Sequence, residues 1–143
     1  ATHLTKLMAH EGIDVSRITL KGGAPHQDFL SAYNRVDIAL DPIPYSGGLT
    51  TCESLWMGVP VVTLRGERFA SLHSTSHLTN ANLKEWITET EKQYIEKVIN
   101  ANKNIEELDA LRANLRQQIM DSPLGDSKQY CRDFSTMLQD CSY

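Results

Sequence analysis

The sequence predicts an α/β fold in which helices cover both faces of a parallel sheet. Segments with the residue pattern of strands alternate with segments patterned like helices. The segment 36–41 (VDIALD) is also apolar enough to lie inside a sheet. The chain of 143 residues is 41% apolar and 22% charged, which suits one globular domain and is too short for two ordinary ones.

The N-terminal part predicts a helix, a strand and a second helix. Apolar residues recur at helical spacing over 3–11, and Gly12 follows as a stop signal. Residues 17–21 (RITLK) alternate and then meet two glycines, so they predict a strand. Pro25 opens a short helix with an apolar face, because proline is tolerated at the first helical position.

The central part continues the alternation. Residues 36–41 predict a strand, and residues 42–48 (PIPYSGG) contain too many prolines and glycines for regular structure, so they predict a loop. A helix follows over about 50–57, and Gly58 fits its C-terminal cap. Residues 60–64 (PVVTL) predict a further strand.

The second half of the chain is more helical. We expect one helix over 69–83 and a short fourth strand at 86–88. Apolar residues at steps of three and four predict helices over 91–102 and 105–119. The last predicted helix, 126–139, has apolar side chains that we expect to point inward: Tyr130, Phe134, Met137 and Leu138.

Charge and hydropathy exclude some kinds of partner. Lys plus Arg number 14 and Asp plus Glu 18, which gives a formal net charge of −4. The sequence therefore lacks the basic excess of a protein that mainly binds nucleic acid. No apolar run approaches the roughly 18 residues of a membrane span. We expect neither nucleic acid nor a membrane as partner.

The cysteines predict neither a disulfide scaffold nor a nucleophile. Cys52, Cys131 and Cys141 are an odd number at no metal-ligand spacing, so a reducing, cytoplasmic compartment is the expectation. No histidine lies in a convincing partner motif for a catalytic cysteine.

The candidate ligand site follows from the predicted sheet. Such sheets bind ligands outside the carboxyl ends of their strands, which directs attention to the loops 21–26 and 41–50. The run 46–51 (SGGLTT) leads from a strand end into a helix start, where unpaired N–H groups and the positive end of the helix dipole bind phosphate. Glu53, one turn later, could accept hydrogen bonds from ribose hydroxyls.

A purely structural interpretation of this run also stands. Thr50 and Glu53 have capping-box spacing, in which Thr50 caps the helix and Glu53 reaches back to it. Neither a Gly-Lys-Thr phosphate loop nor a dinucleotide fingerprint occurs.

Other candidates have structural explanations that we favour. His73 and His77 are four residues apart on a predicted helix, as metal ligands can be, but no third ligand is evident and we expect no metal. Asp37 and Asp41 could form a pair of catalytic carboxylates, but we expect Asp37 to start a strand and Asp41 to cap the loop. Trp56 could be a sugar platform, and we expect it in the core instead.

One long run resembles a known family. Residues 36–71 (VDIALDPIPYSGGLTTCESLWMGVPVVTLRGERFAS) are similar to the C-terminal lobe of O-GlcNAc transferases, glycosyltransferase family 41, including its bacterial tetratricopeptide-repeat-linked relatives. The segment 122–124 (SPL) and the aromatic last helix also resemble the end of that lobe. The resemblance covers about residues 13–140.

The resemblance implies a Rossmann-like C-terminal lobe of a two-lobed, B-type glycosyltransferase fold. Residues 1–143 would be a single UDP-sugar-binding lobe, with C-terminal helices over 91–140, and a fragment of a longer enzyme. The family transfers N-acetylglucosamine or a related hexose from a UDP-sugar to Ser or Thr of proteins, with inversion, and some relatives glucosylate Asn. It needs no metal or other cofactor.

The missing N-terminal lobe would supply the catalytic groups and most of the acceptor site. We therefore expect no catalytic residue in this chain and no turnover by it alone. The alternative is a non-catalytic nucleotide-binding or protein-interaction module with a degenerate donor site. A third hypothesis is a different nucleotide-sugar enzyme of the same two-lobed architecture, such as an epimerase.

The resemblance also assigns UDP-binding positions. Gly47 to Thr51 would hold the diphosphate and Glu53 the ribose, and Ala24 and Pro25 would present backbone groups to the uracil. The sequence departs from the family pattern at two of these positions. Phe29 stands where the family commonly has a histidine, and Leu49 stands where it typically has a threonine. The expected UDP-binding residues are Ala24, Pro25, His26, Phe29, Ser46, Gly47, Gly48, Leu49, Thr50, Thr51 and Glu53.

Overall fold

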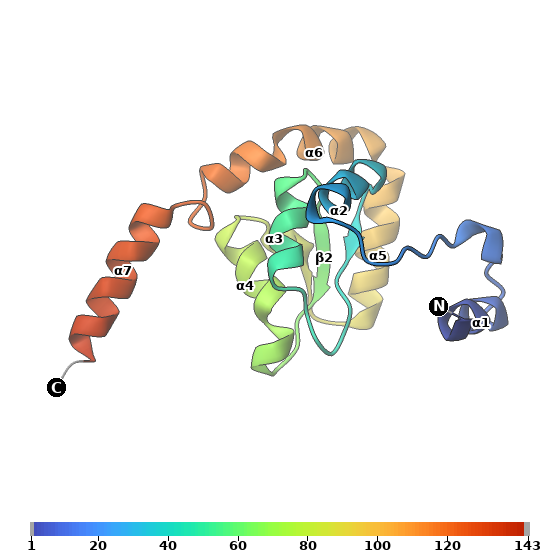
Figure 1. Cartoon of the computed structure of the whole chain (residues 1–143), viewed down its shortest axis with the longest axis horizontal. Coiled ribbons are helices and arrows are strands. Elements are labelled where there is room, and N and C mark those ends of the chain that lie inside the picture. Colours follow the sequence, from blue (N-terminus) through green and yellow to red (C-terminus); the bar gives the residue numbers. More distant parts are fainter. Residues whose placement is uncertain (1, 142–143) are drawn as a thin grey trace.

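A computed structural model describes residues 2–141 and shows a layered α/β body with one helix extending from each end (Figure 1). Short 3-10 turns lie at 15–17, 33–35, 69–71 and 84–86. The strands are β1 (Ala39–Leu40), β2 (Val61–Leu64) and β3 (Ile87–Thr88). The helices are α1 (Thr2–His10), α2 (His26–Ala32), α3 (Leu49–Trp56), α4 (His73–Asn80), α5 (Glu91–Lys103), α6 (Ile105–Met120) and α7 (Ser127–Asp140).

Within residues 2–141 the sheet has three parallel strands in the order β1-β2-β3. Ala39 pairs with Val61, and Thr63 pairs with Ile87. β2 is therefore central, and its first three residues are buried, as expected for a strand covered on both faces. The prediction of a parallel α/β sheet is confirmed.

Helices cover both faces of this sheet. α3 and α4 contact β2 from one side, and α5 packs on the other (Figure 1). α6 contacts both α3 and α5 and closes one end of the body. The core cluster is apolar, and fully buried leucine or valine side chains come from α3, β2, α4, the segment after α4 and α6: Leu55, Val62, Leu78, Leu83 and Leu115. α5 adds only partly buried side chains such as Tyr94 and Val98.

The glycine and proline signals locate most element boundaries correctly. Pro25 directly precedes α2, and Gly58 has φ +77 just after α3, the left-handed conformation that glycine adopts at helix ends. A side chain at Gly58 would also meet the Arg112 carbonyl oxygen at 3.0 Å. The predicted helices over 91–102 and 105–119 are confirmed as α5 and α6.

The predicted strand at 17–21 is wrong. A 3-10 turn occupies Val15–Arg17, and the residues after it are irregular. A strand requires a neighbouring strand to accept and donate its backbone hydrogen bonds, and β1 lies at the edge of the sheet without pairing to this segment. Leu20 is consequently 45% exposed.

The predicted single helix over 69–83 is divided in two. The side chain of Ser71 accepts a hydrogen bond from the Arg68 N–H and donates one to the Arg68 carbonyl. Such local side-chain bonds compete with helical ones, and they fold the start of the segment into a separate 3-10 turn. α4 then ends at Asn80, and Asn82 has φ 57.

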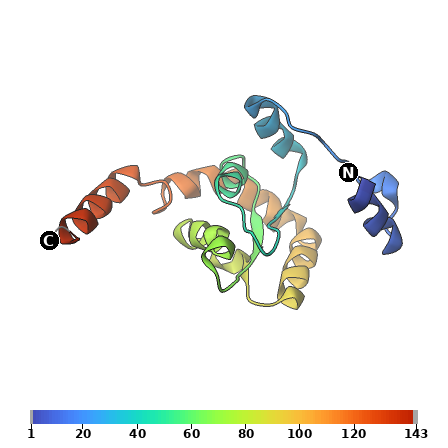
Figure 2. The same ribbon diagram turned by 60° about the horizontal axis from the view of Figure 1, so that its bottom comes forward.

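The inward orientation expected for the last helix is also wrong. α7 forms as predicted but extends away from the body, as does α1 at the opposite end, and both views agree (Figures 1 and 2). The side chains that the pattern assigned to the core are 45–68% exposed, namely Tyr130, Phe134, Met137 and Leu138. No helix among the described residues is long and apolar enough to span a membrane.

Trp56 lies at the surface rather than in the core. Its side chain is 43% exposed at the end of α3. The Arg116 guanidinium covers the ring at 5.1 Å from its centroid and donates to the Trp56 carbonyl at 2.7 Å. The indole and the guanidinium therefore form a cation–π pair that joins α3 to α6.

Candidate functional site

The loop after β1 is folded around one buried carboxylate. Asp41, 5% exposed, accepts hydrogen bonds from the Gly47 N–H and the Thr63 hydroxyl, both at 2.6 Å. The carboxylate thereby closes the loop and fastens it to β2. The interpretation of Asp41 as the cap of this loop is confirmed.

Two hydroxyls attach this loop and the start of α3 to α4. Ser46 Oγ, on a residue 2% exposed, accepts from the N–H groups of His73 and Ser74 at 3.1 and 3.4 Å. Thr51 Oγ1 and Ser74 Oγ lie 2.8 Å apart in the interior. These hydroxyls are already engaged within the protein, so Ser46 and Thr51 hold the loop and the start of α3 in place.

Gly47 allows this packing because it has no side chain. A Cβ there would lie 2.5 Å from Thr51 Oγ1 and 3.3 Å from the Asp41 carboxylate. Its N–H is already bonded to Asp41. Gly48, by contrast, has open space around it and precedes the first residue of α3.

The capping-box interpretation of Thr50 and Glu53 is wrong. Gly48 occupies the cap position, and no side chain caps α3. The amides of Leu49 and Thr50 belong to the first turn, where N–H groups have no partner within the helix. This uncapped end, flanked by the exposed Thr50 side chain, is suited to an anionic group.

Glu53 instead faces the other predicted ligand loop, residues 21–26. Its Oε1 lies 2.7 Å from His26 Nε2, and the two side chains are 12% and 69% exposed. Ala24 and Pro25 are exposed in the segment just before His26. The fold thus brings the segment before α2 beside the start of α3, although the two are far apart in the sequence and only the loop after β1 follows a strand.

Phe29 and Tyr33 complete this side of the site. Their rings meet edge to face with centroids 5.4 Å apart, and Phe29 is 37% exposed. The Tyr33 hydroxyl donates to the Thr50 carbonyl at 3.2 Å. Burial, with the Glu53 charge, raises the pKa of Tyr33 and keeps this donor protonated. The sequence pattern did not predict this contact of Tyr33.

The sequence also did not predict a role for Ser74, because no residue pattern marks this serine. Its hydroxyl donates to the Gly47 carbonyl at 3.0 Å and contacts Thr51. The Ser74 hydroxyl reaches these groups only because α4 packs beside the start of α3. Among residues 2–141, His73 and His77 gain no third ligand, since no three metal-binding side chains come together.

Cys52 lies on α3 next to Glu53 and is half-buried. Burial is the main cause that raises the pKa of its thiol, so little thiolate forms near neutral pH. We expect Cys52 to react with a maleimide more slowly than the exposed Cys131 and Cys141. Mass spectrometry of partly labelled, folded protein measures the order, and labelling of Cys52 first would contradict the prediction.

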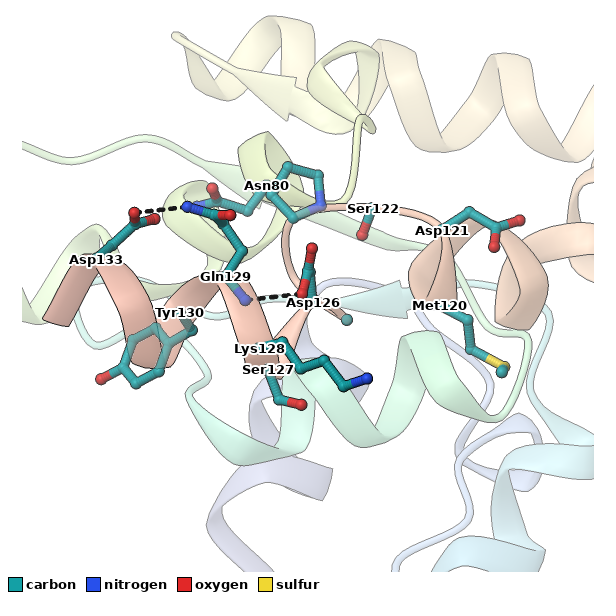
Figure 3. A pocket seen from close by; sticks show the side chains of 12 residues that line it. Asn80, Met120, Asp121, Ser122, Asp126, Ser127, Lys128, Gln129, Tyr130 and Asp133 are labelled. Carbon is teal, nitrogen blue, oxygen red and sulfur yellow. Dashed lines mark hydrogen bonds between the residues drawn. The ribbon is translucent and has the colours of Figure 1, made fainter. Parts of the chain in front are cut away.

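A separate hollow lies where α7 leaves the body (Figure 3). Its polar groups are mostly occupied by helix-end bonds: Gln129 donates from its N–H to Asp126 and from its side chain to Asp133. The Leu124 N–H also donates to the Asn80 carbonyl at 3.2 Å. None of the predicted site residues lines this hollow, which marks the start of α7.

Comparison with known proteins identifies the family. The model of glycosyl transferase family 41 matches residues 1–134. The chain belongs to glycosyl transferase family 41. The resemblance noted in residues 36–71 is therefore confirmed.

Individual relatives agree with this assignment. The chain is 37% identical over 107 residues to a barley (Hordeum vulgare) protein named probable UDP-N-acetylglucosamine–peptide N-acetylglucosaminyltransferase SPINDLY, covering 75% of this chain and 11% of that protein. It is 29% identical over 136 residues to the UDP-N-acetylglucosamine–peptide N-acetylglucosaminyltransferase of Caenorhabditis elegans, covering 95% of this chain and 12% of the relative. The chain thus spans about a tenth of these proteins.

A solved structure shares the fold of this family 41 chain. A mutant of the Thermobaculum terrenum O-GlcNAc transferase superposes with a TM-score of 0.84 at 35% identity, covering 97% of this chain and 26% of that one. The three-stranded parallel sheet with its flanking helices therefore matches the C-terminal lobe of a B-type glycosyltransferase.

Proposed function

We propose that this chain is the UDP-sugar-binding lobe of a protein glycosyltransferase. The enzyme would transfer N-acetylglucosamine or a related hexose, with inversion, to Ser or Thr of proteins, or to Asn. The 2.7 Å pairing of His26 with Glu53 beside the uncapped start of α3 carries the proposal. The names of the barley and nematode relatives support the donor and acceptor classes.

In this proposal each part of the nucleotide has a partner of matching chemistry. The diphosphate lies at the start of α3, where the amides of Leu49 and Thr50, the Thr50 hydroxyl and the helix dipole stabilise its charge without a metal ion. The Glu53 carboxylate accepts hydrogen bonds from the ribose hydroxyls, and His26 fixes its orientation. The uracil lies against Phe29 and the backbone of residues 24–25.

The lobe would work together with a further part of the enzyme. A second lobe supplies the catalytic groups and contacts the acceptor protein. The compartment is reducing and cytoplasmic, which is consistent with the free thiols of Cys52, Cys131 and Cys141.

Calorimetric titration with UDP tests the donor site. We expect the folded chain to bind UDP, and Glu53→Ala to weaken binding about tenfold or more, because a hydrogen bond to a charged group contributes roughly 1.5–3 kcal/mol. Thr50→Ala should weaken it less, since one neutral donor is lost. Glu106→Ala, exposed on α6, is the matched control.

Two results would count against the proposal. One is the absence of heat at millimolar UDP while circular dichroism shows folded protein. The other is unchanged UDP affinity in both the Glu53 and Thr50 variants, which would favour a non-catalytic interaction module with a degenerate site.

A further inference from the structure

The Tyr94 hydroxyl connects the far layer of the fold to the loop after β1. Tyr94 lies on α5, which packs on the opposite face of the sheet from α3 and α4 (Figure 1). Its hydroxyl donates to the Asp41 carbonyl at 3.3 Å, and its ring is partly buried against the core cluster. Burial, and next the Asp41 charge, raises the pKa of Tyr94. The hydroxyl therefore stays protonated and able to donate at neutral pH.

Asp41 is the residue through which Tyr94 can act on the proposed diphosphate site. The Asp41 N–H donates to the Val62 carbonyl at 3.0 Å, which ties its backbone to β2. Its carboxylate accepts from the Gly47 N–H, and α3 begins two residues after Gly47. A shift of the Asp41 backbone would therefore move Gly47 and the first amides of α3 with it.

The loop that follows Asp41 is loosely held on the side of α5. Pro42 and Pro44 have no N–H groups with which to fix its backbone. A hollow of about 320 Å³ lies beside Tyr94, between this loop and α5. Ile43 on the loop and Ile95 on α5 line the hollow and are 52% and 58% exposed. Because apolar packing does not fill this space, the Tyr94 hydroxyl is well placed to fix where the chain leaves β1.

We propose that Tyr94 is a positioning residue for the diphosphate, an inference that rests on the proposed UDP site. Tyr94 does not touch the nucleotide and acts through Asp41. Its hydroxyl holds the Asp41 carbonyl, and the Asp41 carboxylate holds Gly47, so the amides at the start of α3 are oriented before the ligand arrives. Such preorganisation raises affinity, because fewer groups have to be ordered on binding. The pair of His26 and Glu53 is held by its own contact.

Tyr94→Phe tests this role on the whole chain, because it removes the hydroxyl and keeps the ring. We expect calorimetry to show UDP binding weakened about threefold, as the loss of one neutral hydrogen bond allows. The midpoint of urea denaturation should stay nearly unchanged. Asp41 borders the hollow, so water there can bond to its carbonyl without fixing its position.

Nuclear magnetic resonance of the free protein gives a second readout. In Tyr94→Phe we expect the amide signals of Gly47, Leu49 and Thr50 to shift, although these residues lie on the other side of the sheet from α5. Tyr130→Phe is the matched control, since Tyr130 is 68% exposed on α7. This control should change neither the signals at the start of α3 nor the UDP affinity.

The outcomes separate this role from a purely structural one and from the proposed function. Unchanged UDP affinity in Tyr94→Phe, or unchanged amide signals at the start of α3, overturns the positioning role alone. Weaker UDP binding together with a large fall in the urea midpoint also overturns it, because the hydroxyl would then stabilise the whole lobe. Failure of the folded original chain to bind UDP overturns both the donor site and the role that depends on it.

Discussion

Replacing Asp41 with alanine is expected to lower the free energy of unfolding by about 3 kcal/mol or more. The Gly47 N–H and the Thr63 hydroxyl both donate to this carboxylate at 2.6 Å, and Thr63 is fully buried. Both donors would lose their partner, and hydrogen bonds to a charged group contribute roughly 1.5–3 kcal/mol each. Urea denaturation measures the change as a shift in midpoint.

Asp37→Ala is the matched control for this substitution. Asp37 lies four residues earlier, and its side chain is 85% exposed beside Arg112. Exposed ion pairs contribute only about 0–1 kcal/mol, so its midpoint should barely move. Equal effects of the two substitutions would falsify the view that Asp41 holds the loop together.

Loss of Asp41 should also weaken UDP binding. The carboxylate sets the position of Gly47, and the first residues of α3 follow directly. We expect Asp41 to act through structure rather than by touching the diphosphate, because each of its two oxygens already accepts a hydrogen bond, one from the Gly47 N–H and one from the Thr63 hydroxyl. The affinity therefore falls through misplacement of the loop.

Local backbone chemistry explains why much of the fold follows from the sequence. Gly58 and Pro25 fix helix ends by their own conformational preferences, and the prolines and glycines of 42–48 exclude regular structure. Buried strands such as β2 show as apolar runs. These signals act within a few residues, so they require no knowledge of the tertiary structure.

Tertiary pairing explains what the sequence did not predict. Residues 17–21 have a strand pattern, but a strand forms only where a partner strand is present. The apolar face of α7 resembles a core face, although no layer of the described body covers it. The spacing of Thr50 and Glu53 fits a capping box, but His26, 27 residues earlier, binds Glu53 instead.

Leu55→Ala is expected to lower the free energy of unfolding by about 3–5 kcal/mol, the range for leucine-to-alanine changes in a close-packed core. Leu55 is 0% exposed, on the face of α3 that packs in the core cluster with Val62 and Leu115. The cavity would lie within this cluster, which includes side chains of β2 and α6. Urea denaturation and a lowered melting temperature measure the loss.

Leu49→Ala, on the same helix, is the control that separates the loss of core packing from a change in helix propensity. Leu49 is 73% exposed, and alanine and leucine are both good helix formers, so the change should stay within about 0.5 kcal/mol. The two leucines are six residues apart in sequence, but Leu55 belongs to the core and Leu49 to the exposed start of the helix, where we propose that the diphosphate binds. A Leu49 variant as unstable as the Leu55 variant would contradict this division. A stable Leu49 variant instead tests the ligand-facing role of that end through UDP affinity alone.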